Sequence, residues 1–544
     1  MTTLSYEATG AARRTREQHL PALLEDKVAT RIFARDATLW GLEAEAEAAV
    51  RLGWVEAGAV SRPLVAEILA LRDALRDEGV TRIVLCGMGG SSLAPEVIAG
   101  TAGVEMAVLD STDPDQVAAV LADRLAETAI VVSSKSGSTL ETDSQRRIFE
   151  HAFTQAGIDA KSRIIVVTDP GSPLDKASRD AGYRTVFNAD PNVGGRFSAL
   201  TAFGLVPCGL AGVDIQALLD EAEEAAKILN DDSGENIGLA LGAVLGGTNP
   251  LRNKIVIVDE GSGIVGFADW AEQLIAESTG KLGTGVLPVV AEPSSLEVAS
   301  GAQDVLVIRL VAADADIELG QNEVAIGGGL GVQMMVWEFA TAVAGRLLGI
   351  NPFDQPDVEA AKMAARGLLD VQQEPVPTNF TDGPIEVRGG AWLGSAGTAA
   401  EAVSALLAEL GPDGYLSIQA YFDRLAYAPF EGVRDSLAVI AGRPVTFGWG
   451  PRFLHSTGQF HKGGPAIGVF LQVTAAAVTD LPIPDRPFTF GELIAAQAAG
   501  DAQVLSDHGR PVLRLHLTDR AAGVKALQEL LTSLASQAAL SRES

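Results

Sequence analysis

Three short segments carry residue types that together can bind a phosphate and move a proton. Gly87–Ser92 (Gly-Met-Gly-Gly-Ser-Ser) and Ser134–Thr139 (Ser-Lys-Ser-Gly-Ser-Thr) offer closely spaced backbone amides and hydroxyls, the donors with which proteins hold an anion. In the third segment, Gln273 and Glu277 are one helical turn apart, and Ser278–Lys281 ends the predicted helix with a glycine. A carboxylate that faces a polar cleft can act as a general base. The three segments therefore predict a phosphate cradle beside a single proton-transferring carboxylate.

An arginine could stabilise negative charge near that carboxylate. Arg196 follows two glycines in Asn192–Ser198, so its guanidinium can emerge from a tight turn toward a developing oxyanion. Each segment also has a purely structural interpretation: a Gly/Ser turn with a helix N-cap, a surface turn with a solvated arginine, or a solvated glutamate at a helix end. Two hydroxyl-rich segments after two strands of one sheet favour phosphate binding over that alternative.

Short apolar runs separated by helical patterns predict the elements that position these segments. Strands are expected at residues 81–86, 105–109, 128–132, 163–167 and 184–187. This alternation is typical of a doubly wound α/β domain, in which ligands collect beyond the carboxyl ends of parallel strands. A second series predicts another α/β domain of similar plan, with strands at 254–258, 286–290, 304–311, 415–421, 445–449 and 512–517. We expect a helical segment at 1–60, a first domain at 61–235 and a second domain at 236–544.

The amino-acid composition indicates which binding partners to exclude and in which cellular compartment to expect the protein. The 544 residues carry a formal net charge of −29 and a pI of about 4.6, so the exterior would repel nucleic acid and an anionic membrane, and neither is expected as a partner. An anionic substrate then needs a locally positive pocket. The two cysteines, Cys86 and Cys208, and the absence of an apolar export core in Met1–Lys27 predict a reducing cytoplasm. The long apolar stretch Met334–Ile350 is interrupted by charged residues and is predicted as a buried helix, not a bilayer span.

Five segments occur in the order in which glucose-6-phosphate isomerase carries its signatures: Gly87–Pro95, Ser134–Thr142, Asn192–Ser198, Gln273–Lys281 and Asn351–Lys362. The chain thus resembles the glucose-6-phosphate isomerase (phosphoglucose isomerase) family over about residues 80–365. The Gln-x-x-x-Glu-Ser-x-Gly-Lys and Asn-Pro-Phe-Asp-Gln segments are the most specific. The resemblance implies two doubly wound parallel-sheet sugar-isomerase (SIS-type) domains with additional helices. It also implies an aldose-ketose isomerase of glycolysis and gluconeogenesis that needs neither a metal nor a redox cofactor.

The resemblance implies roles for individual residues as well. Glu277 would be the base that moves a proton between C2 and C1, Arg196 would stabilise the enediolate, and Lys362 would assist ring opening. The substrate and its 6-phosphate would be bound by Gly89, Gly90, Ser91, Ser134, Lys135, Ser136, Thr139 and Gln273.

The histidine segment departs from the order of the family. Members place a ring-opening histidine between the catalytic glutamate and the Asn-Pro-Phe-Asp-Gln helix, an interval that contains no histidine here. A similar Leu-His-Ser-x-Gly-Gln core occurs at Leu454–Gln459, directly after the predicted strand 445–449. We expect a rearranged chain order in which His455 reaches the same site, with His461 and Lys462 as rivals and a structural role for the segment as the alternative. In the family this histidine comes from the neighbouring subunit, so the resemblance implies a homodimer.

Three other functions remain open from the sequence. Gly261–Gly266 lies between a predicted strand and a helix, with Glu292 after the next strand, which is the context of a dinucleotide site and of an NAD(P)-dependent enzyme. A sugar-phosphate-binding SIS sensor would need the phosphate segments but no base. An isomerase of another hexose phosphate, such as mannose 6-phosphate, would share every motif, because the choice between C2 epimers depends on pocket shape.

Overall fold

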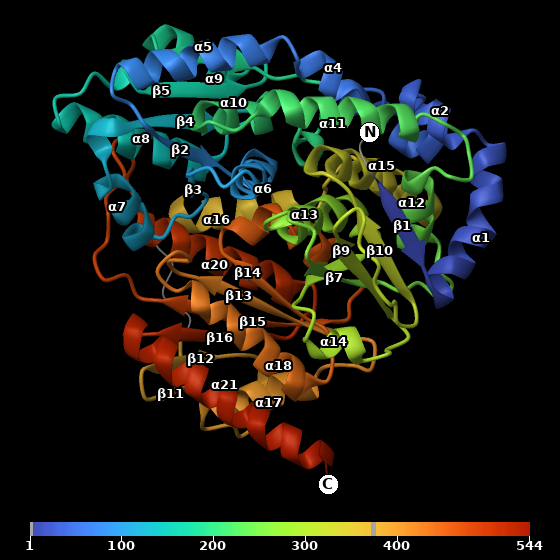
Figure 1. The fold of residues 1–544 in the computed structure, drawn as a ribbon. Helices are drawn as coiled ribbons and strands as arrows, with labels where there is room; N and C mark the ends of the chain where they lie inside the picture. The colour runs from blue at the N-terminus through green and yellow to red at the C-terminus, as the bar shows by residue number, and fades with distance from the viewer. Residues whose placement is uncertain (1–3, 371–376, 544) are drawn as a thin grey trace.

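The computed structural model describes residues 4–370 and 377–543, apart from the side chains of residues 359–362, 370 and 541–543. Its strands form three sheets, each flanked by helices. Figure 1 shows the first sheet at the top, the second at the right and the third below. None of the helices in the described ranges is long and apolar enough to traverse a bilayer.

The first sheet is parallel throughout, in the order β3-β2-β4-β5-β6. Its strands are β2 (Arg82–Gly87), β3 (Ala107–Leu109), β4 (Thr128–Ser133), β5 (Ile164–Thr168) and β6 (Thr185–Asn188). Alternate residues of β2, β4 and β5 belong to two different apolar clusters, because helices cover both faces. These helices are α5 (Leu64–Asp77), α6 (Leu93–Thr101), α7 (Pro114–Ala122), α8 (Leu140–Gln155), α9 (Pro173–Ala181) and α10 (Ala202–Ala211). All five predicted strands of this sheet are confirmed.

The second sheet has the order β1-β10-β9-β7-β8 and is parallel except for β1. Its strands are β1 (Ser5–Ala8), β7 (Lys254–Glu260), β8 (Leu287–Val290), β9 (Val305–Val311) and β10 (Glu323–Gly327). Its helices are α1 (Gly10–Glu25), α11 (Ile215–Leu229), α12 (Ile237–Gly247), α13 (Phe267–Thr279), α14 (Leu296–Ala299) and α15 (Leu330–Leu348). The first 60 residues are mainly helical as predicted, with α2 (Val28–Phe33), α3 (Leu42–Ala48) and α4 (Ala57–Ser61) following α1. The exception is β1, which is too short to show a periodic pattern.

The third sheet has the order β11-β12-β16-β15-β13-β14. Its strands are β11 (Phe380–Asp382), β12 (Ile385–Arg388), β13 (Tyr415–Tyr421), β14 (Val445–Trp449), β15 (Gly468–Ala475) and β16 (Val512–Leu517). One face packs against α17 (Ala399–Ala408), α18 (Val433–Ala441) and α21 (Arg520–Glu543). The other face meets α19 (Gly458–Gly463) and α20 (Phe490–Asp507), and α20 packs in turn against α16 (Val358–Asp370). Figure 1 shows α20 and α16 between the first sheet and the third.

The third sheet corrects one expectation. The strands predicted at 415–421, 445–449 and 512–517 exist, but they pair with one another and with β15, and not with β7, β8 or β9. Apolar runs identify strands, whereas the sheet that a strand joins depends on the connections between strands. The predicted fold class, α/β with doubly wound parallel sheets, is confirmed, and the third sheet is an addition to it. The boundaries at 60/61 and 235/236 stay predictions.

Candidate active site

Helix α13 brings the predicted base into contact with two other predicted site residues. The side chain of Glu277 is 13% exposed, and its Oε1 lies 3.3 Å from Nη1 of Arg196. Gln273, one turn earlier on the same face, donates from Nε2 to Oε2 of Glu277 (3.0 Å) and to the backbone carbonyl of His455 (2.8 Å). Gln273 therefore joins the predicted base to the histidine segment.

Arg196, in the short 3-10 helix η6 (Gly195–Phe197), is a buried and firmly held positive charge. Burial lowers the pKa of its guanidinium and the nearby Glu277 opposes this effect; an arginine stays protonated in proteins even so. Its donors reach Ser278 Oγ (2.7 Å), Gln355 Oε1 (3.0 Å) and the backbone carbonyls of Pro352 (2.7 Å) and Asp354 (3.0 Å). Several bonds thus fix the guanidinium beside the carboxylate of Glu277.

Two glycines of the first predicted segment allow this arrangement. A Cβ atom on Gly90 would lie 2.0 Å from the carbonyl oxygen of Gly195, so any larger residue would push the Arg196 turn away. Gly89 has φ +56°, and a Cβ there would lie 2.9 Å from Nε2 of Gln273. Both glycines and the half-buried Ser91 form the 3-10 helix η3 (Gly89–Ser91), directly after β2.

The serine-rich segment forms the turn between β4 and α8. Ser134 Oγ donates to Thr139 Oγ1 (3.2 Å) and accepts the backbone N–H of Gly137 (3.1 Å), while the hydroxyls of Ser136 and Ser138 bond to each other (2.7 Å). Thr139 is the N-cap residue of α8. The turn therefore presents hydroxyls and a helix N-terminus at the carboxyl end of a parallel strand, the arrangement that favours an anion.

Lys135 lies in this turn, but its ammonium group turns toward a neighbouring carboxylate. Its Nζ is 2.7 Å from Oδ2 of Asp169 and 3.4 Å from the carbonyl of Pro191. The lysine side chain thus has an intramolecular partner, and the predicted contact of Lys135 with phosphate stays a prediction.

His455 lies in the 3-10 helix η9 (Arg452–His455) and reaches the site within its own chain. Its Nε2 is 3.0 Å from Oε1 of Glu141, in the first turn of α8, and the two side chains are 13% and 9% exposed. Gln497 of α20 donates from Nε2 to the same Oε1 (2.7 Å) and accepts from Oγ1 of Thr112 (2.7 Å). A carboxylate bonded in this way orients the imidazole.

The rival residues have other bonding partners than His455. His461 is 1% exposed, and its two ring nitrogens contact Tyr415 Oη (2.9 Å) and Ser417 Oγ (3.2 Å), while burial holds its pKa well below the ordinary value. Lys462 forms a buried ion pair with Asp501 (2.5 Å). Lys362 belongs to α16, but its side chain lies outside the described residues.

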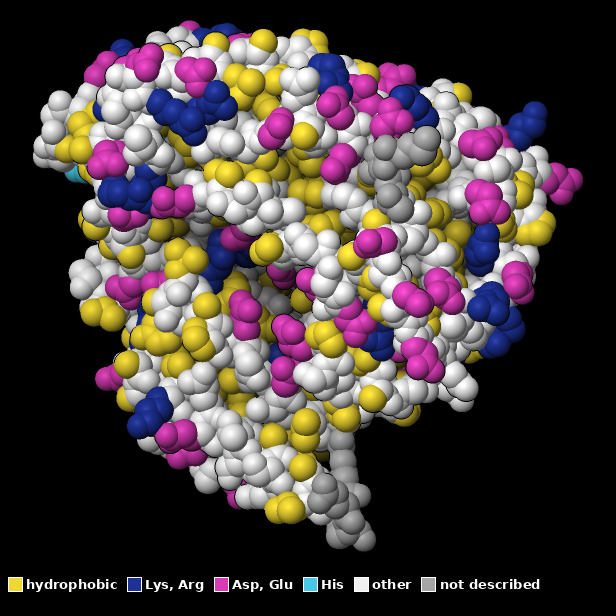
Figure 2. Space-filling view, in the orientation of Figure 1, with side chains coloured by type: hydrophobic (Ala, Val, Ile, Leu, Met, Phe, Trp, Pro, Cys, Tyr) yellow, Lys and Arg dark blue, Asp and Glu magenta, His cyan; other side chains and the backbone are white. Residues whose placement is uncertain are grey.

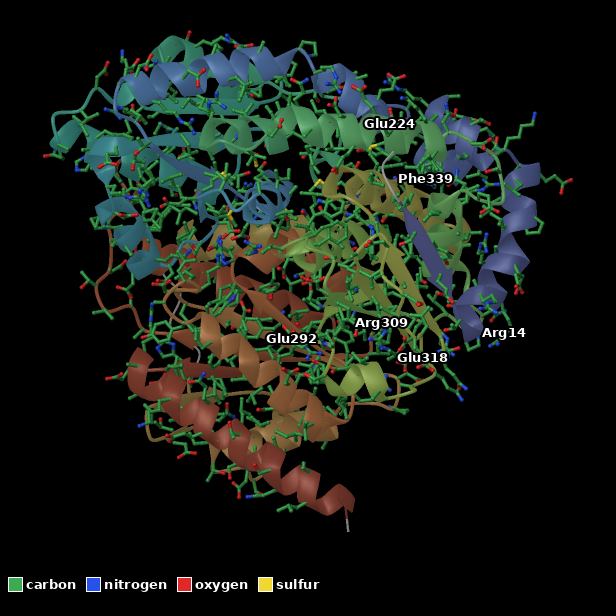
Figure 3. The ribbon with its side chains drawn as sticks, viewed as in Figure 1. Arg14, Glu224, Glu292, Arg309, Glu318 and Phe339 are labelled. Carbon is green, nitrogen blue, oxygen red and sulfur yellow. The ribbon has the colours of Figure 1, made fainter. Side chains whose placement is uncertain are left out.

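Two cavities flank η9 and differ in charge. Leu454 and His455 line a cavity of about 210 Å³ whose charged and hydroxyl-bearing walls are Ser136, Ser138, Thr139, Glu141, Arg366 and Lys462. Arg452, Phe453 and Ser456 line the other, of about 280 Å³, together with Arg434 and five acidic residues, Asp269, Glu272, Glu292, Glu431 and Asp435. In the face of the molecule that Figure 2 shows, acidic side chains surround a central hollow. Figure 3, in the same orientation, labels Glu292 in that region. A phosphate would be repelled from the acidic cavity, so the serine-lined cavity suits an anionic substrate.

Two contacts of the site were missed by the sequence analysis. Glu141 lies inside the quoted segment Ser134–Thr142, but nothing there indicates that its partner is His455. Gln497 is 356 residues from Glu141 along the chain and lies in no motif. Its role depends on how α20 packs.

The chain is similar to known glucose-6-phosphate isomerases. The profile of the phosphoglucose isomerase family matches residues 74–282, a range that includes Gly261–Gly266 and gives the dinucleotide alternative no support. Glucose-6-phosphate isomerase of Synechococcus elongatus is 31% identical over 366 residues, which cover 56% of this chain and 69% of the relative. A probable glucose-6-phosphate isomerase of Natronomonas pharaonis is 30% identical over 350 residues, covering 55% of this chain and 82% of the relative.

Solved structures support the fold. A glucose-6-phosphate isomerase from Chlamydia trachomatis superposes with a TM-score of 0.52 at 22% identity, covering 68% of this chain and 88% of that one. A hypothetical protein from Thermus thermophilus gives a TM-score of 0.57 at 24% identity, covering 67% of this chain and 100% of that one. The five ordered motifs, the profile match and these relatives together show that the chain belongs to the phosphoglucose isomerase family.

Proposed function

We propose that the chain interconverts glucose 6-phosphate and fructose 6-phosphate through an enediolate, with Glu277 as the base. The family relationship supports the reaction, and the contact between Glu277 and Arg196 at 3.3 Å, bridged to His455 by Gln273, is the observation that supports these roles. A proton on a carbon next to a carbonyl is weakly acidic, so its removal needs a base together with a positive charge near the oxygen that becomes negative.

The reaction then follows as a series of proton transfers. The 6-phosphate is held by the hydroxyls and helix N-terminus of the serine-rich turn, and His455, oriented by Glu141, opens the sugar ring. In the open aldose, Glu277 takes the proton from C2, and the C1 carbonyl becomes the enediolate oxygen beside Arg196. A proton passes between the two oxygens, C2 becomes the carbonyl carbon, and Glu277 delivers to C1 a proton that can exchange with solvent in the interval. No electron leaves the substrate, because the oxidation of C2 balances the reduction of C1.

Gln273 contributes a group that is free to bind the sugar. Its Oε1 is buried and has no hydrogen-bond partner among the residues that the structure describes. A buried acceptor of this kind is costly unless it is satisfied. We propose that it accepts a hydroxyl of the open-chain substrate next to the carbon from which Glu277 takes the proton.

We also propose that the protein is cytoplasmic and forms a homodimer. Both rest on the composition and on the family resemblance. The contacts of His455 with Gln273 and Glu141 lie within one chain, so a dimer is not required to assemble them.

The test is incubation of the full chain with fructose 6-phosphate in heavy water, with NMR detection of deuterium at C2 of the glucose 6-phosphate formed. We expect deuterium at C2, and we expect Glu277→Gln to lower kcat about 10²- to 10⁴-fold with little change in KM, because the base acts mainly in the transition state. Glu67→Gln, the same change on the exposed face of α5, is the matched control and should keep full activity. Normal turnover by Glu277→Gln would exclude Glu277 as the base.

A further inference from the structure

The third sheet has a large cavity at the place where its topology predicts a ligand. Strands β14 and β15 pair with opposite sides of β13, all three parallel, so a crevice opens at the carboxyl ends of β13 and β15. Ligands of open parallel sheets bind at such switch points. A cavity of about 880 Å³ lies there, lined by Tyr421 at the end of β13 and by Thr474–Ala477 at the end of β15. This volume is that of a small-molecule site, roughly 300–1,000 Å³.

The cavity is separate from the candidate active site. Among the described residues that line it, none belongs to the serine-rich turn, to α13 or to η9. Its walls come from the third sheet, from α20, from the end of α16 and from the start of α7. A ligand bound there would therefore occupy a place distinct from the candidate active site.

The sheet face toward this cavity is polar. Along β16, Leu513, Leu515 and Leu517 pack into the apolar core with α17, α18 and α21. Alternation along the strand turns Arg514 and His516 to the opposite face, and both line the cavity. A sheet face that packs against a helix is normally apolar, so these polar residues call for a specific reason.

Arg514 contributes a positive charge to the wall of the cavity. Its Nε donates to Oε1 of Gln472 (3.0 Å), and within the described residues it forms no ion pair. Arg388 stands directly opposite it in the antiparallel register of β12 and β16, a pairing of like charges that is destabilising. Burial, together with Arg388, lowers the pKa of Arg514. An anion bound in the cavity would relieve both effects.

The acidic residues that line the cavity are already engaged. Asp113 forms a two-bond pair with Arg520 (3.1 and 2.7 Å), and Glu386 pairs with Arg388 (2.8 Å). Asp480 and Glu492 bond to backbone amides at the start of α20. None of these carboxylates is bonded to Arg514 among the described residues.

Tyr421 supplies a second donor. Its side chain is 2% exposed, it lines the cavity, and its Oη has no hydrogen-bond partner among the residues that the structure describes. Burial and then the nearby Asp501 raise the pKa of this hydroxyl, so it remains protonated and can donate. A buried hydroxyl without a partner is unusual and costs stability.

The remaining walls are apolar and built from small residues. Ala475–Ala477 of the sheet side face Ala495, Ala496, Ala498 and Ala499 of α20, with Phe488 and Ile494 beside them. We propose that this cavity is a second ligand site, which binds a small organic molecule carrying one oxyanion group, phosphate or carboxylate, on an apolar body. Arg514 and Tyr421 hold the oxyanion, and the alanine-lined wall holds the apolar part.

Isothermal titration of the full chain with phenyl phosphate and, separately, with benzoate tests the proposal. We expect at least one of the two probes to bind, and the stronger of them identifies the preferred oxyanion. Arg514→Gln and Tyr421→Phe should each weaken that binding about tenfold or more, the worth of a hydrogen bond to a charged group. Both variants should keep normal isomerase kinetics, which also shows that they fold. Arg179→Gln, which removes an exposed arginine of α9, is the matched control and should bind normally.

Two results would overturn the proposal. One is the absence of binding of both probes up to millimolar concentrations. The other is binding that Arg514→Gln and Tyr421→Phe leave unchanged, since the probe would then occupy another place, such as the serine-rich turn.

Discussion

Replacement of Glu141 by glutamine should slow the isomerisation of cyclic hexose phosphates and leave an open-chain substrate almost unaffected. The substitution keeps the size of the side chain but removes the negative charge 3.0 Å from Nε2 of His455. Both side chains are largely shielded from water, at 9% and 13% exposure, so the charge is poorly screened. A hydrogen bond to a charged group contributes about 1.5–3 kcal/mol. We therefore expect kcat/KM for the cyclic substrate to fall about 10- to 100-fold.

The assay compares fructose 6-phosphate with its 5-deoxy analogue, which lacks the hydroxyl that closes the ring. Glu141 acts through His455, so Glu141→Gln combined with His455→Ala should be no slower than His455→Ala alone on fructose 6-phosphate. With the 5-deoxy analogue, all three variants should approach the kcat/KM of the unaltered chain. An equal loss on both substrates, or fully additive effects of the two substitutions, would show that Glu141 does not act by positioning His455 for ring opening.

Two further predictions concern buried groups outside the usual motifs. Gln497→Met removes the donor that holds Glu141 at 2.7 Å, and it should lower kcat/KM on cyclic substrate by about tenfold, the lower end of the range for a hydrogen bond to a charged group, without changing the rate on the 5-deoxy analogue; an equal loss on both would refute a positioning role. Glu338 of α15 is fully buried with both oxygens unpartnered among the described residues, and burial raises its pKa well above 4.5. The folded chain therefore favours the neutral carboxyl, and the contribution of Glu338 to stability is greatest below pH 4.5 and declines as the pH rises. Urea unfolding of Glu338→Met should show a gain of about 1–3 kcal/mol at pH 8 and a smaller gain at pH 5, and equal gains would contradict this linkage.

The first sheet could be predicted from the sequence because its strands are buried on both faces. Such strands read as continuous Val- and Ile-rich runs, as in β4 and β5, and the intervening helices are long enough to mark each boundary. The third sheet could not be predicted in the same way. Strand β13 reads like a strand of any parallel sheet, and its pairing with β15 depends on a connection that periodicity does not encode.

In the site, too, contacts within one segment could be predicted from the sequence, whereas contacts between distant segments could not. Helical spacing places Gln273 beside Glu277, and the observed bond of 3.0 Å agrees with it. The serine-rich turn was also predictable, but the ammonium group of Lys135 pairs with Asp169, the residue that follows β5. Local sequence cannot show which of two anions, a carboxylate or a phosphate, a lysine will meet.

The position of His455 indicates what the third sheet contributes to the site. The histidine follows β14 and Gln497 lies on α20, so two groups that converge on Glu141 come from the part of the chain that builds this sheet. The match to the family profile ends at residue 282, well before both of them. Helix α20 also lines the larger cavity through Ala496 and Ala498, which flank Gln497 in sequence. A shift of this one helix would therefore change both the cavity and the bond that orients Glu141, and through it His455.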